Sequence, residues 1–300
     1  MKSLFGIIGI VATCTTTTLS AQEILLPRKE GSVRFLVFGD AGTGGREQYQ
    51  VANQMLRYSQ RFPFTFAIML GDNIYGSERP QDFDKKFTQP YRALLDGKIE
   101  FNAALGNHDD PNQRYFKPFN MGGNRYRTFK KGNVRFFVID SNYLDPEQVK
   151  WLEKELSASQ SEWKVAYFHH PLYTTARRGP EVELRAVLEP LFVKYGVDVV
   201  FTGHEHIYER FNPQMGIYYF TVGGAAKLRR GDTHPSSLLA ARFDRDRSFL
   251  LAEIAGDSLY FQTISRLGAI VDKGVIARRE VRPPATAVTT GSSSTAPKAP

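Results

Sequence analysis

The sequence predicts an α/β (α+β) fold in which two β-sheets pack as a sandwich and helices flank them. Apolar runs of strand length alternate with helical patterns through the first two thirds of the chain, which is typical of strand–helix–strand units. After residue 207 the pattern changes to closely spaced strands. Alternation followed by a β-meander favours two packed sheets with helices outside.

Six apolar runs are predicted to be buried strands: residues 33–38, 64–70, 101–105, 134–139, 163–168 and 197–202. Helical patterns lie between several of them, at residues 45–61, 146–157 and 180–195. Asp145 is a candidate N-cap for the second helix, and Gly196 is placed to end the third. The later strands are expected at 217–222, 248–254 and 259–265, antiparallel, with a turn at Gly256-Asp257.

The chain divides into a leader, a core and a tail. Residues 1–21 combine Lys2, an apolar run and small residues, as a secretory signal does, and the run is too short to span a bilayer. Residues 22–281 hold no linker rich enough in Gly, Pro or Ser to divide them, so we expect a single domain. The Thr/Ser/Pro-rich segment 282–300 has no aromatic residue and no periodicity, and it is expected to be a disordered tail or tether.

The one cysteine, Cys14, lies inside the leader, so a mature chain that begins near residue 22 has neither a disulfide nor a catalytic thiol. A second interpretation stays open, because residues 11–14 resemble a bacterial lipoprotein box in which Cys14 becomes the lipidated terminus. Thr13 fits that box poorly, which favours plain export. We therefore expect an extracytoplasmic protein, periplasmic or secreted, with membrane attachment only if Cys14 is lipidated.

The net charge suits an anionic partner without defining one. The chain carries +8, and loss of Lys2 with the leader leaves 38 basic and 31 acidic residues, or +7. Solubility alone explains a dispersed positive charge equally well. No segment interleaves aromatic and basic residues as a nucleic-acid groove does, so no nucleic-acid partner is expected. The oligomeric state is left open.

Five polar blocks each follow one of the predicted strands. They are Gly39-Asp40, Gly71-Asp72-Asn73-Ile74-Tyr75, Gly106-Asn107-His108-Asp109, His169-His170-Pro171 and Gly203-His204-Glu205-His206. Loops at the carboxyl ends of strands are where α/β sheets collect their ligands. The blocks supply two carboxylates, a phenol, an amide and several imidazoles, the donor set of a two-metal hydrolytic centre.

Formal charges agree with such a centre. For one trivalent and one divalent ion, Asp40, Asp72 and a Tyr75 phenolate contribute −3, and a bridging hydroxide makes −4. The remaining +1 attracts a phosphate without trapping the product. Asn107, a neutral ligand where a third carboxylate could stand, preserves that surplus.

The order GDAG, GDNIY, GNHD, HHP, GHEH, over residues 35–224, resembles the calcineurin-like metallophosphoesterase superfamily and, more narrowly, the purple acid phosphatases (the tartrate-resistant acid phosphatase-like family). Tyr75 is the distinguishing residue, since most other members of the superfamily lack a tyrosine there. The resemblance implies two metal ions, Fe(III) with Fe(II), Zn or Mn. It assigns the ferric ion to Asp40, Tyr75 and His206, the divalent ion to Asn107, His169 and His204, and the bridge to Asp72.

Two further residues bear on the substrate. The family has a second histidine nine residues after the lone metal histidine, whereas this chain has Arg178, which can clamp phosphate oxygens but cannot donate a proton at working pH. His108, beside Asn107, is expected to meet the substrate and the leaving group.

Other residues near the blocks are expected to have structural roles. His170 is interpreted as orienting His169 or as packing. Glu209 and Arg210 are expected to pair, and Lys227 is equally a rim residue or a solvated one.

The sequence thus predicts an exported binuclear-metal phosphatase, a phosphoric monoester hydrolase. A metal-activated hydroxide attacks phosphorus in line, and the substrate is a phosphorylated small molecule. Two alternatives stay open. The same centre could serve a phosphodiesterase or nucleotidase, or the chain could be a non-catalytic surface protein that binds anions.

Overall fold

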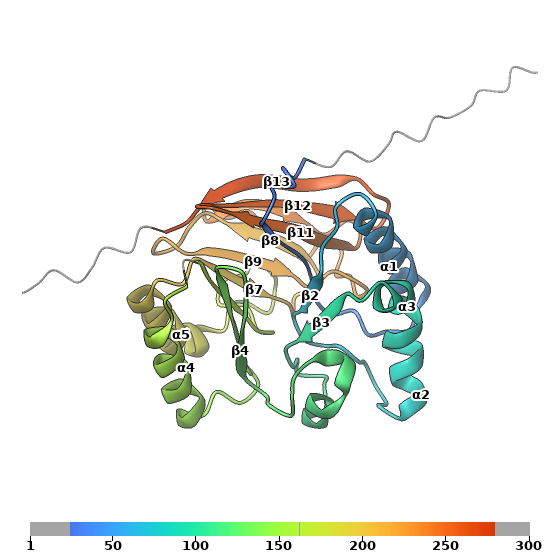
Figure 1. Ribbon diagram of the computed structural model, residues 1–300, viewed down its shortest axis with the longest axis horizontal. Helices are drawn as coiled ribbons and strands as arrows, with labels where there is room; N and C mark the ends of the chain where they lie inside the picture. Colours follow the sequence, from blue (N-terminus) through green and yellow to red (C-terminus); the bar gives the residue numbers. More distant parts are fainter. Residues whose placement is uncertain (1–24, 162, 280–300) are drawn as a thin grey trace, which may run out of the picture.

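Two mixed β-sheets stack face to face, with helices on the outer side of each, in the computed structural model (Figure 1). The structure describes residues 25–161 and 163–279. The predicted leader (1–21) and tail (282–300) lie entirely outside these ranges. Within the described ranges, no helix is long and apolar enough to cross a bilayer.

The first sheet has six strands in the order β13-β12-β11-β1-β2-β3. β1 pairs in parallel with β2, and β2 with β3, while β11 runs antiparallel to β1 and continues into a meander. The bounds are β1 (Val33–Phe38), β2 (Phe66–Met69), β3 (Glu100–Ala103), β11 (Ser248–Ala255), β12 (Ser258–Ser265) and β13 (Ile270–Ala277).

The second sheet has seven strands in the order β10-β8-β9-β7-β6-β5-β4. Its centre is parallel, from β5 through β6 and β7 to β9, and its edges are antiparallel. The bounds are β4 (Arg127–Lys131), β5 (Val134–Val138), β6 (Trp163–Tyr167), β7 (Val199–Thr202), β8 (Tyr208–Phe211), β9 (Tyr218–Val222) and β10 (Leu239–Phe243).

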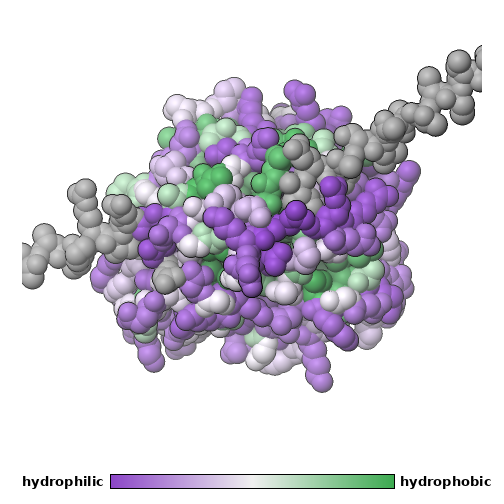
Figure 2. All heavy atoms as spheres, turned by 45° about the horizontal axis from the view of Figure 1, so that its top comes forward, coloured by the Kyte–Doolittle hydropathy of each residue, from purple (hydrophilic) through white to green (hydrophobic). Residues whose placement is uncertain are grey.

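Three apolar clusters form three layers. Side chains from both sheets, among them Phe35, Phe66, Phe136 and Phe201, fill the space between the sheets. A second cluster packs the first sheet against α1 (Arg46–Ser59) and α3 (Gln89–Asp96). In the chain, α3 follows α2 (Pro80–Phe83) and a π-helical turn (Asp84–Thr88). The third packs the second sheet against α4 (Pro146–Ala158) and α5 (Val182–Tyr195). Two short 3-10 turns, Pro111–Tyr115 and Lys117–Phe119, follow β3. The outer face in Figure 2 is mostly hydrophilic, with small apolar patches.

The predicted two-sheet sandwich is confirmed, and so are the predicted start of one helix and the predicted end of another. Asp145 caps α4 by accepting a hydrogen bond from the Gln148 amide, and Gly196 ends α5 with a left-handed φ of 70°. One expectation needs correction: the strand predicted at 217–222 does not join the meander of the other late strands. It is β9, which lies in the second sheet, parallel to β7 and antiparallel to β8.

Candidate metal centre

Strand ends from both sheets meet at one place and bring the five polar blocks together. Asp40 follows β1 and Asp72 follows β2, while His169 follows β6 and His204 follows β7. Three of these residues adopt left-handed backbone angles: φ is 57° at Asp40, 51° at Asp72 and 67° at His204. Such angles are unfavourable for residues with a Cβ and recur at functional sites, where the surrounding structure holds them.

The first group of donors contains Asp40, Asp72, Tyr75 and His206. Asp40, Asp72 and His206 present ligand atoms within 4.8 Å of one another. The Tyr75 hydroxyl lies 3.1 Å from Asp40 Oδ1 and 3.2 Å from His206 Nε2. His206 Nε2 is 3.4 Å from Asp40 Oδ1. This is the group to which the sequence assigned the ferric ion.

The second group contains Asn107, His169 and His204. Asn107 Oδ1 lies 3.1 Å from His169 Nε2 and 2.9 Å from His204 Nδ1, and the two imidazole nitrogens are 3.2 Å apart. Asp72 joins the two groups, because its Oδ1 is also 3.4 Å from His169 Nε2. All seven residues expected as ligands therefore lie in one continuous cluster.

The donor chemistry of the cluster fits a cation. His169 Nδ1 donates to the Leu70 carbonyl at 2.8 Å, so the proton of the neutral ring is on Nδ1 and the lone pair of Nε2 faces Asn107 and Asp72. The His169 Nε2 lone pair thus meets Asn107 Oδ1 at 3.1 Å and Asp72 Oδ1 at 3.4 Å with no proton between the nitrogen and either oxygen. Such convergence is unfavourable unless a positive charge lies among the donors.

The pKa values agree with that interpretation. Burial lowers the pKa of His204 to about 2 and that of His206 to about 3, helped respectively by His169 and by Arg229, so both rings are neutral and able to bind metal at neutral pH. Burial and the neighbouring Asp72 raise the pKa of Asp40, and burial and Asp40 raise that of Tyr75. Cations would reverse both shifts by stabilising the charged forms.

Glycines make the close approach of the strands possible. A Cβ on Gly203 would lie 2.7 Å from Asp40 Oδ2, and one on Gly106 would lie 2.3 Å from Asp72 Oδ1. Both are far inside van der Waals contact. Gly106 and Gly203 are therefore required, because any side chain at these positions would clash with the carboxylates.

Asp109 ties the second and third blocks together. Its carboxylate accepts hydrogen bonds from the Gly106 and Ile74 amides, at 2.8 and 3.1 Å, and from the Asn73 side chain at 3.0 Å. Burial, with a smaller effect of Asp72, raises the pKa of Asp109 to about 7. Asp109 therefore fixes the loop that carries Asn107 and His108.

The two residues expected to meet substrate lie beside the cluster. His108 is exposed, its amide donates to Asp72 Oδ1 at 3.0 Å, and its ring lies 5.0 Å from that of Tyr75. Arg178 is exposed as well, and its Nη1 is 2.9 Å from His204 Nε2. Both side chains are thus available to a ligand at the centre.

Two neighbouring residues, Glu209 and Arg210, have other partners than the sequence predicted. The expected Glu209–Arg210 pair is wrong, because adjacent residues of strand β8 point to opposite faces. The buried Glu209 carboxylate instead accepts hydrogen bonds from Thr174 and Thr175, in the loop that leads to Arg178. Arg210 pairs with Asp272 of β13 at 2.7 Å.

Two residues whose roles the sequence left open lie beside the centre. Lys227 Nζ lies 4.5 Å from the centre of the Tyr75 ring. His170 does contact a neighbour, Ser141, at 2.9 Å, but its half-buried ring also packs against that of His204 at 4.6 Å. His169, His170 and His204 form a group within metal-ligand reach. The doubled histidine in the fourth block was the signal for this third ring.

The calcineurin-like phosphoesterase family matches residues 33–208, more than half of the chain. The chain belongs to the calcineurin-like phosphoesterases. Among curated members it is similar to purple acid phosphatase 17 of Arabidopsis thaliana, with 27% identity over 72% of this chain and 75% of that one. It is also similar to human tartrate-resistant acid phosphatase type 5, with 24% identity over 88% and 98% of the two chains.

These matches make the chain a calcineurin-like metallophosphoesterase with distant homology to purple acid phosphatases over most of its length. A solved structure described as "GAP50 the anchor in the inner membrane complex of Plasmodium" shares the fold, with a TM-score of 0.74, 17% identity and coverage of 83% and 90%. A centre of two metal ions is typical of the family, and the His and Asp groups described above are its candidate ligands.

Proposed function

We propose that this metallophosphoesterase is a phosphatase of the purple acid phosphatase type that hydrolyses phosphate monoesters of small molecules. The observation that carries the proposal is the position of Asp72, whose carboxylate joins the Asp40–His206 group to the His169–His204 group. One residue shared between two donor sets is what a pair of cations a few ångströms apart requires.

The residues divide between two cations in this proposal. Asp40, Tyr75 and His206 would hold Fe(III), because a phenol and a carboxylate are the anionic donors that a trivalent ion favours. Asn107, His169 and His204 would hold Fe(II), Zn or Mn, and Asp72 would be shared by the two ions. When bound, the two cations neutralise the phosphoryl oxygens and lower the pKa of the attacking water.

The chain's own side chains orient the substrate. His108 is exposed beside Asp72 and Tyr75, and it contacts the leaving oxygen. Arg178 donates to His204 Nε2, which requires that ring to carry its proton on Nδ1. With the ring proton on Nε2 instead, the tautomer in which Nδ1 would be a metal donor, Arg178 would lose this acceptor and its N–H groups would be free to bind phosphoryl oxygens.

Export belongs to the same proposal, since the leader at residues 1–21 has the composition of a secretory signal. Two other functions remain as outcomes of the test. A phosphodiesterase is supported by Arg178 at the position of the family's second histidine. A non-catalytic anion-binding protein is suggested by the possible lipoprotein box at residues 11–14 and by the Thr/Ser/Pro-rich segment 282–300.

The test compares 4-nitrophenyl phosphate with methyl 4-nitrophenyl phosphate, which have the same leaving group, on protein of measured metal content across pH. Faster cleavage of the monoester, dependent on both metals, supports the proposal. Preference for the diester assigns a phosphodiesterase. Phosphate binding without turnover of either ester, at full metal occupancy, assigns the non-catalytic function.

A further inference from the structure

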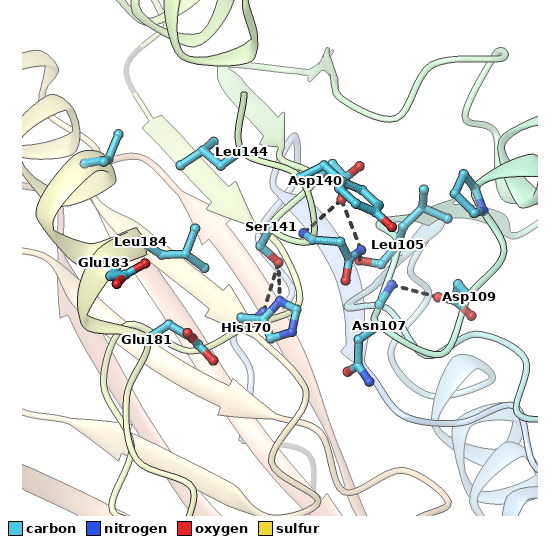
Figure 3. Close-up of a pocket in the computed structure, with 15 residues that line it drawn as sticks. Leu105, Asn107, Asp109, Asp140, Ser141, Leu144, His170, Glu181, Glu183 and Leu184 are labelled. Carbon is cyan, nitrogen blue, oxygen red and sulfur yellow. Dashed lines mark hydrogen bonds between the residues drawn. The ribbon is translucent and has the colours of Figure 1, made fainter. Parts of the chain in front are cut away.

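A cavity of about 610 Å³ opens directly from the candidate metal centre. Asn107 and His170 form its boundary with the centre, and Figure 3 shows His170 between Asn107 and Glu181. The volume is in the range of small-molecule binding sites. A phosphoryl group held at the centre therefore has this cavity beside it for the rest of the substrate.

Besides His170, which lies in the loop after β6, three segments of the chain line the cavity. The loop after β3 contributes Leu105 and Asp109, the loop after β5 contributes Asp140 to Leu144, and the start of α5 contributes Glu181, Glu183, Leu184 and Val187. The walls thus combine aliphatic side chains with carboxylates. Figure 3 shows Glu181, Glu183 and Leu184 together on the wall formed by α5.

The carboxylates in the cavity are of two kinds. Asp140 is buried and paired with Arg125 at 2.6 Å, and Asp109 accepts hydrogen bonds from neighbouring amides, so both have partners. Among the described residues, the side chains of Glu181 and Glu183 form neither a hydrogen bond nor a salt bridge. Their negative charge is therefore available to a ligand.

No lysine or arginine is among the residues that line this cavity. Yet the protein as a whole is basic, at +8, and two of its cations, Arg178 and Lys227, lie against His204 and Tyr75 of the candidate ligand set. Positive charge is thus gathered at the metal centre, while uncompensated negative charge lies in the adjoining cavity. A substrate that is negative at one end and positive at the other matches this arrangement.

We propose that the cavity binds the leaving group of a phosphate monoester of an amino alcohol, with the ammonium group facing Glu181 and Glu183 and the carbon chain against Leu184 and Leu144. This inference rests on the proposed phosphatase function and specifies its substrate class. Hydrolysis consumes one water, which forms the new P–O bond. The ester P–O bond breaks, and the departing oxygen takes a proton to release the amino alcohol and inorganic phosphate.

The cavity also disfavours other leaving groups. An alcohol that bears a carboxylate or a second phosphate would bring its negative charge against Glu181 and Glu183, with no described cation lining the cavity to offset it. A neutral alcohol would contact the aliphatic walls but leave both carboxylates unpaired. Selection by charge is therefore the measurable consequence of this cavity.

The test uses two esters of the same shape, phosphocholine and 3,3-dimethylbutyl phosphate, which differ in carrying a quaternary nitrogen or a quaternary carbon. For the wild-type metal-loaded protein we expect kcat/KM to be about tenfold higher for phosphocholine, the combined effect of two partly exposed charge pairs. In the Glu181→Gln/Glu183→Gln double variant this ratio falls to about 1. The Glu181→Lys/Glu183→Lys double variant, which reverses both charges, lowers the ratio further, below 1.

The matched control is Glu30→Gln/Asp96→Asn, which removes the same two charges from exposed positions outside the cavity and should keep the wild-type ratio. Calorimetric binding of choline, compared with 3,3-dimethylbutan-1-ol, tests the cavity without turnover. We expect choline to bind more tightly, and only while the two carboxylates are present.

The outcomes separate the inference from the proposed function. Equal hydrolysis of both esters by the wild type, or a preference that survives in the double variant, overturns the cavity assignment and leaves the phosphatase intact. Hydrolysis of neither ester by metal-loaded protein that does cleave 4-nitrophenyl phosphate likewise overturns the cavity assignment, whereas failure with all three esters overturns the phosphatase. In that case the choline measurement still decides the cavity, because equal binding of both alcohols contradicts the assignment.

Discussion

The two sheets bring chemically different donors to the centre. The first sheet, through the loops after β1, β2 and β3, contributes oxygen donors: two carboxylates, a phenol and an amide. The second sheet, through the loops after β6 and β7, contributes imidazoles. Asp40 and Asp72 are fully buried and repel each other, whereas burial keeps the imidazoles neutral. Neither sheet holds a complete donor set, so the candidate centre forms only when the two sheets pack against each other.

The largest effect is expected from Asp72→Ala, since Asp72 is the residue that connects the two donor groups. We expect activity to fall by at least about a thousandfold, with loss of paired metal binding. Elemental analysis and initial rates on the same preparation measure both. In chelator-treated protein the variant should unfold at the wild-type temperature or above, because one of two repelling buried carboxylates is gone. A variant that is active with two metals would contradict the assignment.

A smaller effect is expected from Gly203→Ala, which disturbs the point where β7 of the second sheet meets the first sheet. The new Cβ would lie 2.7 Å from Asp40 Oδ2 and 2.8 Å from the Leu70 carbonyl. We expect a loss of about 2–3 kcal/mol in the free energy of unfolding, from urea titration, with weaker metal binding. Gly45→Ala is the control, because its Cβ meets nothing closer than 3.4 Å. Equal stability of the two variants would show that the sheets are not packed as described.

Arg178→Gln should have an effect of about tenfold, mainly as a rise in KM for a phosphate monoester, because the guanidinium binds the phosphoryl group rather than a metal. The neighbouring Arg177→Gln is the control. Arg177 is largely exposed and lies 3.6 Å from Asp232, away from the imidazoles. If both variants raised KM equally, Arg178 would be acting only through general charge.

The smallest effect concerns the other end of β7, far from the donors. Asp198 precedes this strand and accepts hydrogen bonds from the Lys164 and Arg279 amides, and burial raises its pKa to about 6. A raised folded-state pKa favours the protonated form, so this stabilisation is complete below the unfolded-state pKa and is lost as pH rises through about 6. Relative to Asp198→Asn, the wild type should therefore lose about 1 kcal/mol between pH 5 and pH 7.

Urea titrations of both proteins at the two pH values measure that difference. The free energy of unfolding of the wild type, relative to that of Asp198→Asn, should be lower at pH 7 than at pH 5. A difference that stays constant with pH, or that changes in the opposite direction, would show that Asp198 is ionised normally in the folded protein.

The sequence predicted the elements whose residues are buried on both faces. The run 33–38 is β1 to the residue, and the strand ends before Asp40, Asp72 and His204 were located well enough to bring the donors together. Amphipathic edge strands were missed, such as β4 (Arg127–Lys131) and β10 (Leu239–Phe243), because one face of each meets solvent and charged residues interrupt the apolar pattern. Their pairing partners stabilise them, and a local pattern does not contain that information.

The same limit applies around the centre. The order of the five blocks predicted which residues cluster, yet the partners of Glu209 and Arg210 come from residues 174–175 and from Asp272, more than thirty positions away. The cavity beside Asn107 is likewise formed by four segments that meet only in the fold. Sequence motifs therefore located the donors, while packing determined what surrounds them.

The most direct test of the central claim is a titration of metal-free protein with iron and zinc, with metal content and phosphate-monoester hydrolysis followed together. Two donor groups joined by Asp72 predict two ions per chain and activity that appears only as the second ion binds. Full activity with one ion per chain, or with none after exhaustive chelation, would contradict the account.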